Sequence, residues 1–373
     1  MKNIVMITND TTFAYNLRRE IIERFVQEGY HVTLIAEFLS HVEALSAAGC
    51  NLINIQTGRH GTSVMKDVRL FLKYLQILHS CQPDIVLTNN IKPNVYAGLA
   101  CRILRIKYIP NITGLGTPVE KPGPMQRLTT FLYKIGVADA SAILFQNKEN
   151  EKFFQERKLV SPKSKVILLP GSGVNLQSHP LMEYPQDGKI HFLFVARIMK
   201  EKGIDLFLSA ARKFHNENHV FEVVGSCDDE NYLKILKEAQ AQGLIIYHGL
   251  QKDVTPFYER CSCLLYPSYY PEGMSNVLLE AAACGRPAIA ADRSGCRETV
   301  DDGVSGYIVP VKDEQAVLQA VEKFLNLTWQ QRRDMGLAAR AKVEREFDRE
   351  IVVRMYMDEI KQCLGCDEKT HGL

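Results

Sequence analysis

The stretch Cys263–Ala291, "CLLYPSYYPEGMSNVLLEAAACGRPAIAA", decides the fold of this chain. It opens with an apolar run, continues through a loop of small and polar residues, and then shows a helical pattern that starts near Ser275. A second apolar run, "PAIAA", follows the helix. Runs of consecutive apolar residues are typical of strands that are covered on both faces. Strand, helix and strand in this order predict a βαβ unit with parallel strands.

The same alternation extends over most of the 373 residues, which is more than one hydrophobic core usually organises. A stretch rich in Gly, Pro and polar residues, Gly171–Lys189, interrupts it once and predicts a linker. We therefore expect an α/β protein with two tandem, doubly wound, Rossmann-like parallel-sheet domains and C-terminal helices. The predicted ranges are 1–175 for the first domain, 176–189 for the linker, 190–350 for the second domain and 351–373 for a helix and tail. Such domains bind ligands at the carboxyl ends of their strands, which predicts a cleft between the two sheets.

The composition excludes several classes of protein. Apolar residues make up 46% and charged residues 24% of the chain, and no apolar run reaches the roughly 18 residues of a membrane-spanning helix. The N-terminus reads as a short strand and not as a signal peptide, so we expect a cytoplasmic protein. Among the ten cysteines, Cys363 and Cys366 form a single CxxC without the second pair that a zinc site needs. We predict no metal, no cofactor and no nucleic-acid partner.

The small net charge of +2 hides an asymmetry. Residues 1–180 carry a balance of +8 and the remainder a balance of −6. A basic half favours an anionic partner or surface, although charge alone is equally consistent with an uneven solvated surface.

Two carboxylates stand eight residues apart in the opening stretch, Glu272 in the loop and Glu280 in the helix. The first amides of a helix are unpaired and suit a phosphate, and Ser275 and Asn276 are both good caps. Glu280, one turn further on, is placed to accept hydrogen bonds from the paired hydroxyls of a sugar, and Glu272 to reach the other end of the same ligand. The alternative is that Glu280 is a solvated surface residue. Apolar and small neighbours on every side disfavour that alternative.

Two cations follow the strand pattern "IHFLFVA". Arg197 comes directly after this strand, and Lys202 lies at the start of the next helix. Positive charge at this place stabilises the charge that develops on a departing diphosphate, without a metal ion. No Asp-x-Asp occurs in the chain to hold a divalent ion. Gly225 and Gly249 each follow a strand, where they either turn the chain tightly or let its backbone approach a ligand. Solvated surface cations are the alternative for Arg197 and Lys202.

These motifs together resemble the retaining glycosyltransferases of family 4, which have the two-domain GT-B fold. The resemblance rests on "ARIMKEKG", "VVG", "HGLQKDV" and "LLYPSYYPEGMSNVLLEAAACGRPAIAADRSGCRETVDDGVSGYIVP". It implies a nucleotide-sugar donor, a UDP-sugar in first place, held mainly by the C-terminal domain, and transfer with retention and without a metal ion. The implied catalytic residues are Arg197, Lys202 and Glu272; the implied donor-binding residues are Glu280, Gly273, Met274, Ser275, Asn276, Gly225 and Gly249.

The N-terminal half departs from this family at "KYIPNITGLGT", where Thr113 occupies the place of a histidine found in many members. The "GLG" form resembles the branch that extends polyprenyl-diphosphate-linked oligosaccharides, including N-acetylhexosaminyltransferases of capsule and O-antigen assembly. This resemblance implies a lipid diphosphate acceptor and a peripheral position at the inner face of the cell membrane, contacted by the basic N-terminal domain. As acceptor contacts we predict Arg59, Lys92, Asn94, Thr113, Gly114 and Arg127.

Two other functions are compatible with the same motifs. One is a nucleotide-sugar epimerase or hydrolase of the same fold, and the other is a non-catalytic subunit of a glycan-assembly complex. A dinucleotide-dependent dehydrogenase is disfavoured, because "TNDTTF" after the first strand lacks the Gly-x-Gly-x-x-Gly loop.

Overall fold

The computed structural model describes residues 1–56, 64–116, 119 and 122–365. It divides into two compact units, the first formed by residues 1–172 and 349–373 and the second by residues 173–348. The segment 176–189, expected as a linker, lies within the second unit. The C-terminal helix lies within the first unit, although it follows the second unit in sequence.

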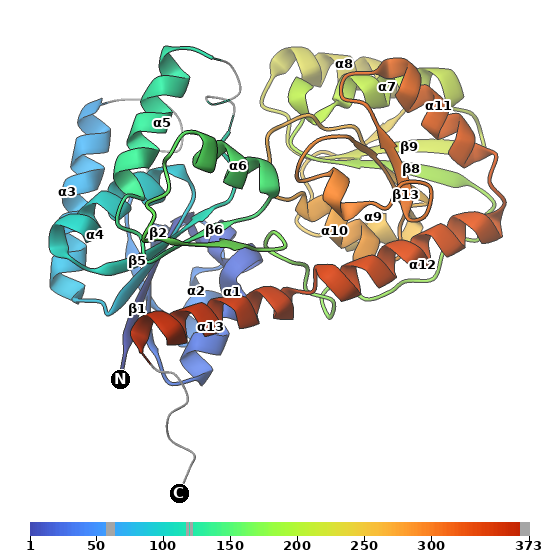
Figure 1. The fold of residues 1–373 in the computed structure, drawn as a ribbon. Coiled ribbons are helices and arrows are strands. Elements are labelled where there is room, and N and C mark those ends of the chain that lie inside the picture. The colour runs from blue at the N-terminus through green and yellow to red at the C-terminus, as the bar shows by residue number, and fades with distance from the viewer. Residues whose placement is uncertain (57–63, 117–118, 120–121, 366–373) are drawn as a thin grey trace, which may run out of the picture. The chain divides into compact units, whose positions relative to one another are not determined.

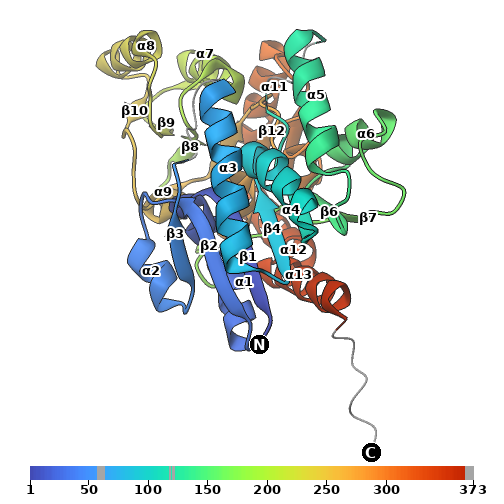
Figure 2. The same ribbon diagram turned by 90° about the vertical axis from the view of Figure 1, so that its left-hand side faces the viewer.

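The first unit is a seven-stranded parallel sheet in the order β3-β2-β1-β4-β5-β6-β7 (Figure 1 and Figure 2). Helices α3, α4 and α5 cover one face of this sheet, and α1, α2 and α13 cover the other. Its elements are β1 (Asn3–Asp10), α1 (Thr11–Gln27), β2 (His31–Glu37), α2 (Val42–Ala47), β3 (Asn51–Asn54), α3 (Val64–Cys81), β4 (Ile85–Asn89), the π-helical turn η1 (Pro93–Ala97), α4 (Gly98–Leu104), β5 (Lys107–Ile112), α5 (Pro124–Gly136), β6 (Ala142–Phe145), α6 (Lys148–Glu156), β7 (Lys165–Leu168) and α13 (Arg349–Leu364).

The second unit is a six-stranded parallel sheet in the order β10-β9-β8-β11-β12-β13. Its elements are β8 (Ile190–Val195), the 3₁₀ turn η3 (Lys200–Lys202), α7 (Ile204–Phe214), β9 (His219–Val224), α8 (Glu230–Ala241), β10 (Ile246–Tyr247), α9 (Thr255–Arg260), β11 (Cys263–Tyr266), α10 (Asn276–Ala283), β12 (Ala288–Ala291), the 3₁₀ turn η4 (Arg297–Thr299), β13 (Gly306–Val309), α11 (Glu314–Leu325) and α12 (Trp329–Glu346). The prediction of two parallel-sheet α/β domains is confirmed.

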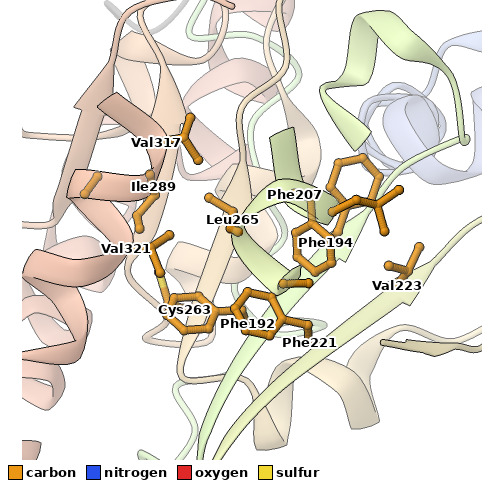
Figure 3. Close-up of a cluster of buried hydrophobic side chains, with 14 of the residues drawn as sticks. Phe192, Phe194, Phe207, Phe221, Val223, Cys263, Leu265, Ile289, Val317 and Val321 are labelled. Atoms are coloured by element: carbon orange, nitrogen blue, oxygen red, sulfur yellow. The ribbon is translucent and has the colours of Figure 1, made fainter. Parts of the chain in front are cut away.

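The consecutive apolar runs form strands that are buried on both faces, as the sequence predicts. Every residue of β4, β6, β11 and β12 is buried. In the second unit, the aromatic rings of Phe192, Phe194, Phe207 and Phe221 interlock between the sheet and α7, and Figure 3 shows this cluster extending to Val317 and Val321 of α11. Covering both faces of a parallel sheet leaves only its strand ends and the following loops for binding.

Candidate functional site

The strand order of the second sheet reverses between β8 and β11, while all of its strands remain parallel. From β8 the chain proceeds outward through β9 to β10, and from β11 it proceeds outward the other way through β12 to β13. Loops that leave two neighbouring strands in opposite directions open a crevice at the carboxyl ends of those strands, and ligands of such sheets bind there. The loop after β8 carries Arg197 and Lys202, and the loop after β11 carries Glu272.

Backbone contact joins these two loops. Gly203 has a left-handed backbone with φ of 83°, and a Cβ at this position would lie 2.4 Å from the carbonyl oxygen of Pro267. The amide of Tyr269 donates a hydrogen bond to the carbonyl oxygen of Glu201, at 2.9 Å. Because only a residue without a side chain fits this approach, Gly203 determines how close Lys202 comes to the β11 loop.

Lys202, Tyr266 and Glu272 form one polar cluster at this crossing. The Lys202 ammonium pairs with Oε1 of Glu272 and donates to the hydroxyl of Tyr266 at 3.0 Å. The Tyr266 hydroxyl in turn donates to the same Glu272 oxygen at 2.8 Å, and the ammonium lies 4.8 Å from the centre of the Tyr270 ring. The side chains of Lys202 and Glu272 are only 15% and 14% exposed. The cluster is therefore preorganised and partly shielded from water.

The charge of Lys202 is stabilised in this environment. Burial lowers the pKa of Lys202, but the hydrogen bonds to Tyr266 and Glu272 and the negative charge of Glu272 outweigh burial and raise it above its ordinary value. The ammonium therefore stays protonated at neutral pH. It has three N–H donors, and the hydrogen bonds to Glu272 and Tyr266 use two of them. No third hydrogen-bond partner of this ammonium occurs among the described residues, so the remaining N–H can donate to an anionic ligand.

Arg197 is more open than Lys202. Its side chain is exposed, and within the described part of the chain its guanidinium donates only to the sulfur of Met199, at 3.3 Å. No hydrogen bond or ion pair joins it to Lys202 or Glu272 in the described structure. Two predicted catalytic residues are thus brought together, and the third lies on the same loop as Lys202 with its donors open to solvent.

Helix α10 begins where the sequence predicts, with Ser275 as its N-cap residue. Among the amides at the start of this helix, that of Ser275 is already used, because it donates to the carbonyl oxygen of Gly295 at 2.8 Å. The Ser275 hydroxyl and the Asn276 side-chain oxygen are buried and have no hydrogen-bond partner among the described residues. The Met274 side chain packs in the core against α12, so only its backbone can face a ligand. Unsatisfied buried polar atoms are rare, and these two follow Glu272 by three and four residues in the chain.

Glu280 is half-buried and has a partner, and the surface interpretation of this residue is wrong. The hydroxyl of Tyr258, a fully buried residue, donates to Oε2 of Glu280 at 2.9 Å. Burial first, and then the charge of Glu280, raise the pKa of Tyr258 well above its ordinary value. The phenol therefore remains a donor at every physiological pH, and it orients the Glu280 carboxylate.

Gly225 and Gly249, the two glycines predicted to contact the donor, differ in how open their backbone is. A Cβ on Gly225 would lie 1.7 Å from the carbonyl oxygen of Ala196, so this glycine is required for packing of the β9 loop against the β8 loop. The Gly225 amide donates to the carbonyl oxygen of Gly249 at 2.8 Å. Gly249 has φ of 65°, and no atom lies within 4 Å of its Cβ position. Of the two, Gly249 presents the more accessible backbone.

The predicted acceptor residues of the first unit have mixed outcomes. Asn94 is wrong as a contact residue: it is fully buried, its side-chain oxygen accepts from Thr88, and its side-chain nitrogen donates to the Asn111 carbonyl. Lys92 pairs with Asp67 at 3.2 Å. The remaining predicted residues that the structure describes are half-buried Thr113 and Gly114, directly after β5, and exposed Arg127 on α5. Arg59 lies outside the described residues.

Sequence reasoning missed Tyr258, Tyr266 and Gly203. Tyr266 ends β11 and Tyr258 lies on α9, and both read in the sequence as ordinary core aromatics. Only the hydrogen bonds of their hydroxyls reveal a site role. Gly203 follows Lys202 directly, but its close approach to Pro267 becomes visible only when the two loops are in place.

Among the described residues, no three His, Cys, Asp or Glu side chains gather in a way that could hold a metal ion. No described helix combines the length and the apolar character needed to cross a bilayer.

Comparison with known proteins matches a family model to each of the two units. Residues 5–147 match the model "Glycosyl transferase 4-like", and residues 183–342 match "Glycosyl transferases group 1". An N,N'-diacetylbacillosaminyl-diphospho-undecaprenol alpha-1,3-N-acetylgalactosaminyltransferase of Campylobacter jejuni is 24% identical over 92% of this chain and 94% of its own length. The Staphylococcus aureus capsular polysaccharide biosynthesis glycosyltransferase CapM is 25% identical over 78% of this chain and 80% of its own length.

Solved structures agree with this placement. Anabaena Alr3699/HepE, solved in complex with UDP and glucose, superposes with a TM-score of 0.79 at 18% identity over 97% of this chain and all of that chain. The sequence matches, the two Rossmann-like sheets and the arrangement at the carboxyl ends of β8 and β11 lead to one conclusion. The chain belongs to the GT-B glycosyltransferases, with a glycosyl transferase 4-like domain followed by a group 1 domain.

Proposed function

We propose that this glycosyltransferase moves a hexose or N-acetylhexosamine from a UDP-sugar to a polyprenyl-diphosphate-linked saccharide during surface polysaccharide synthesis. The observation that carries the proposal is the cluster of Lys202, Tyr266 and Glu272. It lies at the carboxyl ends of β8 and β11, where the strand order of the second sheet reverses. The relatives support the substrate class, because the similar Campylobacter jejuni enzyme is named for an undecaprenyl-diphospho acceptor.

The donor would lie along the loops after β8 and β11. The open N–H of Lys202, the guanidinium of Arg197 and the hydroxyl of Ser275 supply donors for the two phosphates. Glu280, oriented by Tyr258, would accept from the ribose hydroxyls. Glu272 would contact the transferred sugar, and its ion pair with Lys202 would hold the carboxylate and the ammonium in a fixed relation.

We further propose that transfer proceeds with retention and without a metal ion. As the bond between the anomeric carbon and the diphosphate breaks, negative charge develops on the leaving phosphate oxygen. Two cations on one loop can stabilise that charge, since fixed positive groups in a partly shielded site need no reorganisation during the reaction. The raised pKa of Lys202 keeps one of these charges in place.

The test is transfer from a panel of UDP-sugars to a synthetic polyprenyl-diphosphate-linked saccharide, followed by mass spectrometry of the product. Removing a group that stabilises the developing charge lowers kcat by about 10²–10³-fold in comparable sites, and we expect a loss of at least this size for the double variant Arg197→Ala, Lys202→Ala. Wild-type turnover in the double variant would overturn the assignment. Conversion of the UDP-sugar without acceptor would instead support the epimerase or hydrolase alternative.

The place of the reaction follows from the acceptor, and we propose the inner face of the cell membrane with the basic N-terminal domain in contact. Three cations of this domain are already engaged within it: Lys92 with Asp67, Arg102 with Asp139, and Lys107 with the carbonyl oxygen of Cys363. Net charge alone therefore does not identify the contacting surface.

A further inference from the structure

The loop that follows β12 supports the β11 loop on the side that faces away from β8. In the sheet, β11 lies between β8 and β12, so its loop has a neighbour on each side. Gly203 makes the contact on the β8 side, and Gly295 makes it on the β12 side. Gly295 has a φ of 88°, and a Cβ at this position would lie 2.9 Å from the carbonyl oxygen of Gly273 and 3.4 Å from that of Glu272. The β11 loop is therefore held between two glycine contacts.

A hydrogen bond adds to the contact of Gly295. Its carbonyl oxygen accepts from the amide of Ser275 at 2.8 Å. Ser275 is the N-cap residue of α10, but its side chain makes no capping hydrogen bond to the described residues. An N-cap side chain ordinarily fixes the first turn of a helix by accepting from one of its amides. Here the start of α10 is fixed through the carbonyl of Gly295 instead.

Glu298 in turn holds Gly295. It lies on η4, and its Oε2 accepts from the amide of Gly295 at 2.7 Å, while its Oε1 accepts from the hydroxyl of Ser294 at 3.1 Å. Hydrogen bonds to an ionised acceptor are stronger than those between neutral groups. Both oxygens of the carboxylate thus bond within their own loop, and Glu298 acts on the β11 loop through Gly295.

Cys296, directly after Gly295, shows how near this loop lies to the cluster of Lys202, Tyr266 and Glu272. The thiol is fully buried, and burial raises its pKa well above the ordinary value. The charge of Glu272 raises this pKa further, and the charge of Lys202 lowers it. Because interactions between charges fade within about 10 Å, the loop after β12 borders the cluster.

We infer that Glu298 is a positioning residue of the donor site: through Gly295 it fixes the segment from Glu272 to Ser275 in the β11 loop. That this segment contacts a nucleotide-sugar rests on the proposed function, but the positioning itself does not. The inference needs acceptor oxygens and not a negative charge. A glutamine at 298 offers its oxygen to the Gly295 amide and its NH₂ to the hydroxyl of Ser294, which can accept as well as donate.

The first experiment is hydrogen exchange of the full chain without ligand, read by mass spectrometry. Loss of a hydrogen bond to a charged group shifts a local opening equilibrium by about tenfold or more, so peptides within residues 269–279 should exchange at least about tenfold faster in Glu298→Ala. Glu298→Gln should exchange as wild type. The matched control is Asp302→Ala, because this carboxylate also accepts from a backbone amide, that of Ile308 at 2.9 Å, but precedes β13 at the opposite edge of the sheet.

The second experiment measures UDP affinity by calorimetry and kcat with a UDP-sugar. Glu298→Ala should weaken UDP binding about tenfold, and Glu298→Gln and Asp302→Ala should bind as wild type. Gly295→Ala forces the loop away from Gly273 by several tenths of an ångström and should lower kcat about tenfold. Its control is Gly303→Ala, where φ is 74° and no atom lies within 4 Å of the Cβ position, so kcat should be unchanged.

Three outcomes would overturn the positioning role. These are wild-type exchange of residues 269–279 in Glu298→Ala, a Glu298→Gln variant as impaired as Glu298→Ala, or a loss of UDP affinity in Asp302→Ala that equals the loss in Glu298→Ala. Failure of the proposed function has a different signature, since wild type would then neither bind UDP nor transfer a sugar. The exchange experiment needs no ligand and decides the positioning role in that case as well.

Discussion

Gly203→Ala is the sharpest test of how the β8 and β11 loops build the site. The substitution acts in two ways. First, φ at this position is 83°, a left-handed conformation that costs alanine about 1–2 kcal/mol. Second, the new Cβ would lie 2.4 Å from the carbonyl oxygen of Pro267. Ordinary contact requires about 3.5 Å, so the two loops must separate by about 1 Å.

The chain offers a matched control in Gly243→Ala. Gly243 has φ of 75°, and no atom lies within 4 Å of its Cβ position, so the control carries the conformational cost without the steric clash. Overpacking costs about 1–3 kcal/mol, so we expect a loss of about 1–2 kcal/mol for Gly243→Ala and about 2–5 kcal/mol for Gly203→Ala. A displacement of about 1 Å in a catalytic site lowers the rate by about 10²-fold, so kcat should fall only in Gly203→Ala.

Urea unfolding followed by tryptophan fluorescence measures the stability change. The single tryptophan, Trp329, begins α12 in the second unit and donates to the carbonyl oxygen of Pro185, so its emission reports the unit that contains Gly203. Turnover with a UDP-sugar measures the second effect. Equal stability losses in the two variants, together with wild-type kcat in Gly203→Ala, would refute the idea that this contact sets the position of Lys202.

Three further predictions concern other parts of the site and its unit. In Glu222→Gln, a buried carboxylate that accepts from Arg260, His191 and His248 is lost, and we expect a destabilisation of about 3–5 kcal/mol in urea unfolding. Burial raises the pKa of Glu222, but its partners outweigh burial and lower it below 4.5; the same cluster raises the pKa of His191 above 6.5. The stability that Glu222 contributes is lost as pH falls through its lowered pKa, and the stability that His191 contributes is lost as pH rises through its raised pKa. The difference in free energy of unfolding between wild type and Glu222→Gln should therefore be largest between pH 4.5 and 6.5. A difference that does not vary with pH would contradict this. Glu280→Ala should weaken UDP binding at least tenfold in calorimetry, and Tyr258→Phe, which removes only the orienting hydroxyl, should weaken it less; unchanged binding in Glu280→Ala would exclude the ribose role. Incubation with EDTA should leave kcat unchanged, and loss of activity that Mg²⁺ or Mn²⁺ restores would contradict metal independence.

The order of apolar runs and helical patterns by itself determined the two parallel α/β sheets. Strands such as β4 and β11 are apolar at consecutive positions because helices cover both faces of each sheet, and this requirement is written locally in the chain. The position of α10 and the burial of Glu280 could be predicted for the same reason. The cap at Ser275 and the apolar neighbours of Glu280 lie within the same few residues.

The tertiary structure decided which side chains meet. Lys202 and Glu272 are seventy residues apart, and their pairing depends on two strands becoming neighbours and on the backbone approach of Gly203 to Pro267. Asn94 looked like a free polar loop residue, but it is fully buried and its side chain bonds to Thr88 and to the Asn111 carbonyl. The apolar faces of α3 and α5 also read as ordinary amphipathic patterns in the sequence. Only the packed layer shows which side of each helix is covered, because burial depends on neighbours that are distant in the chain.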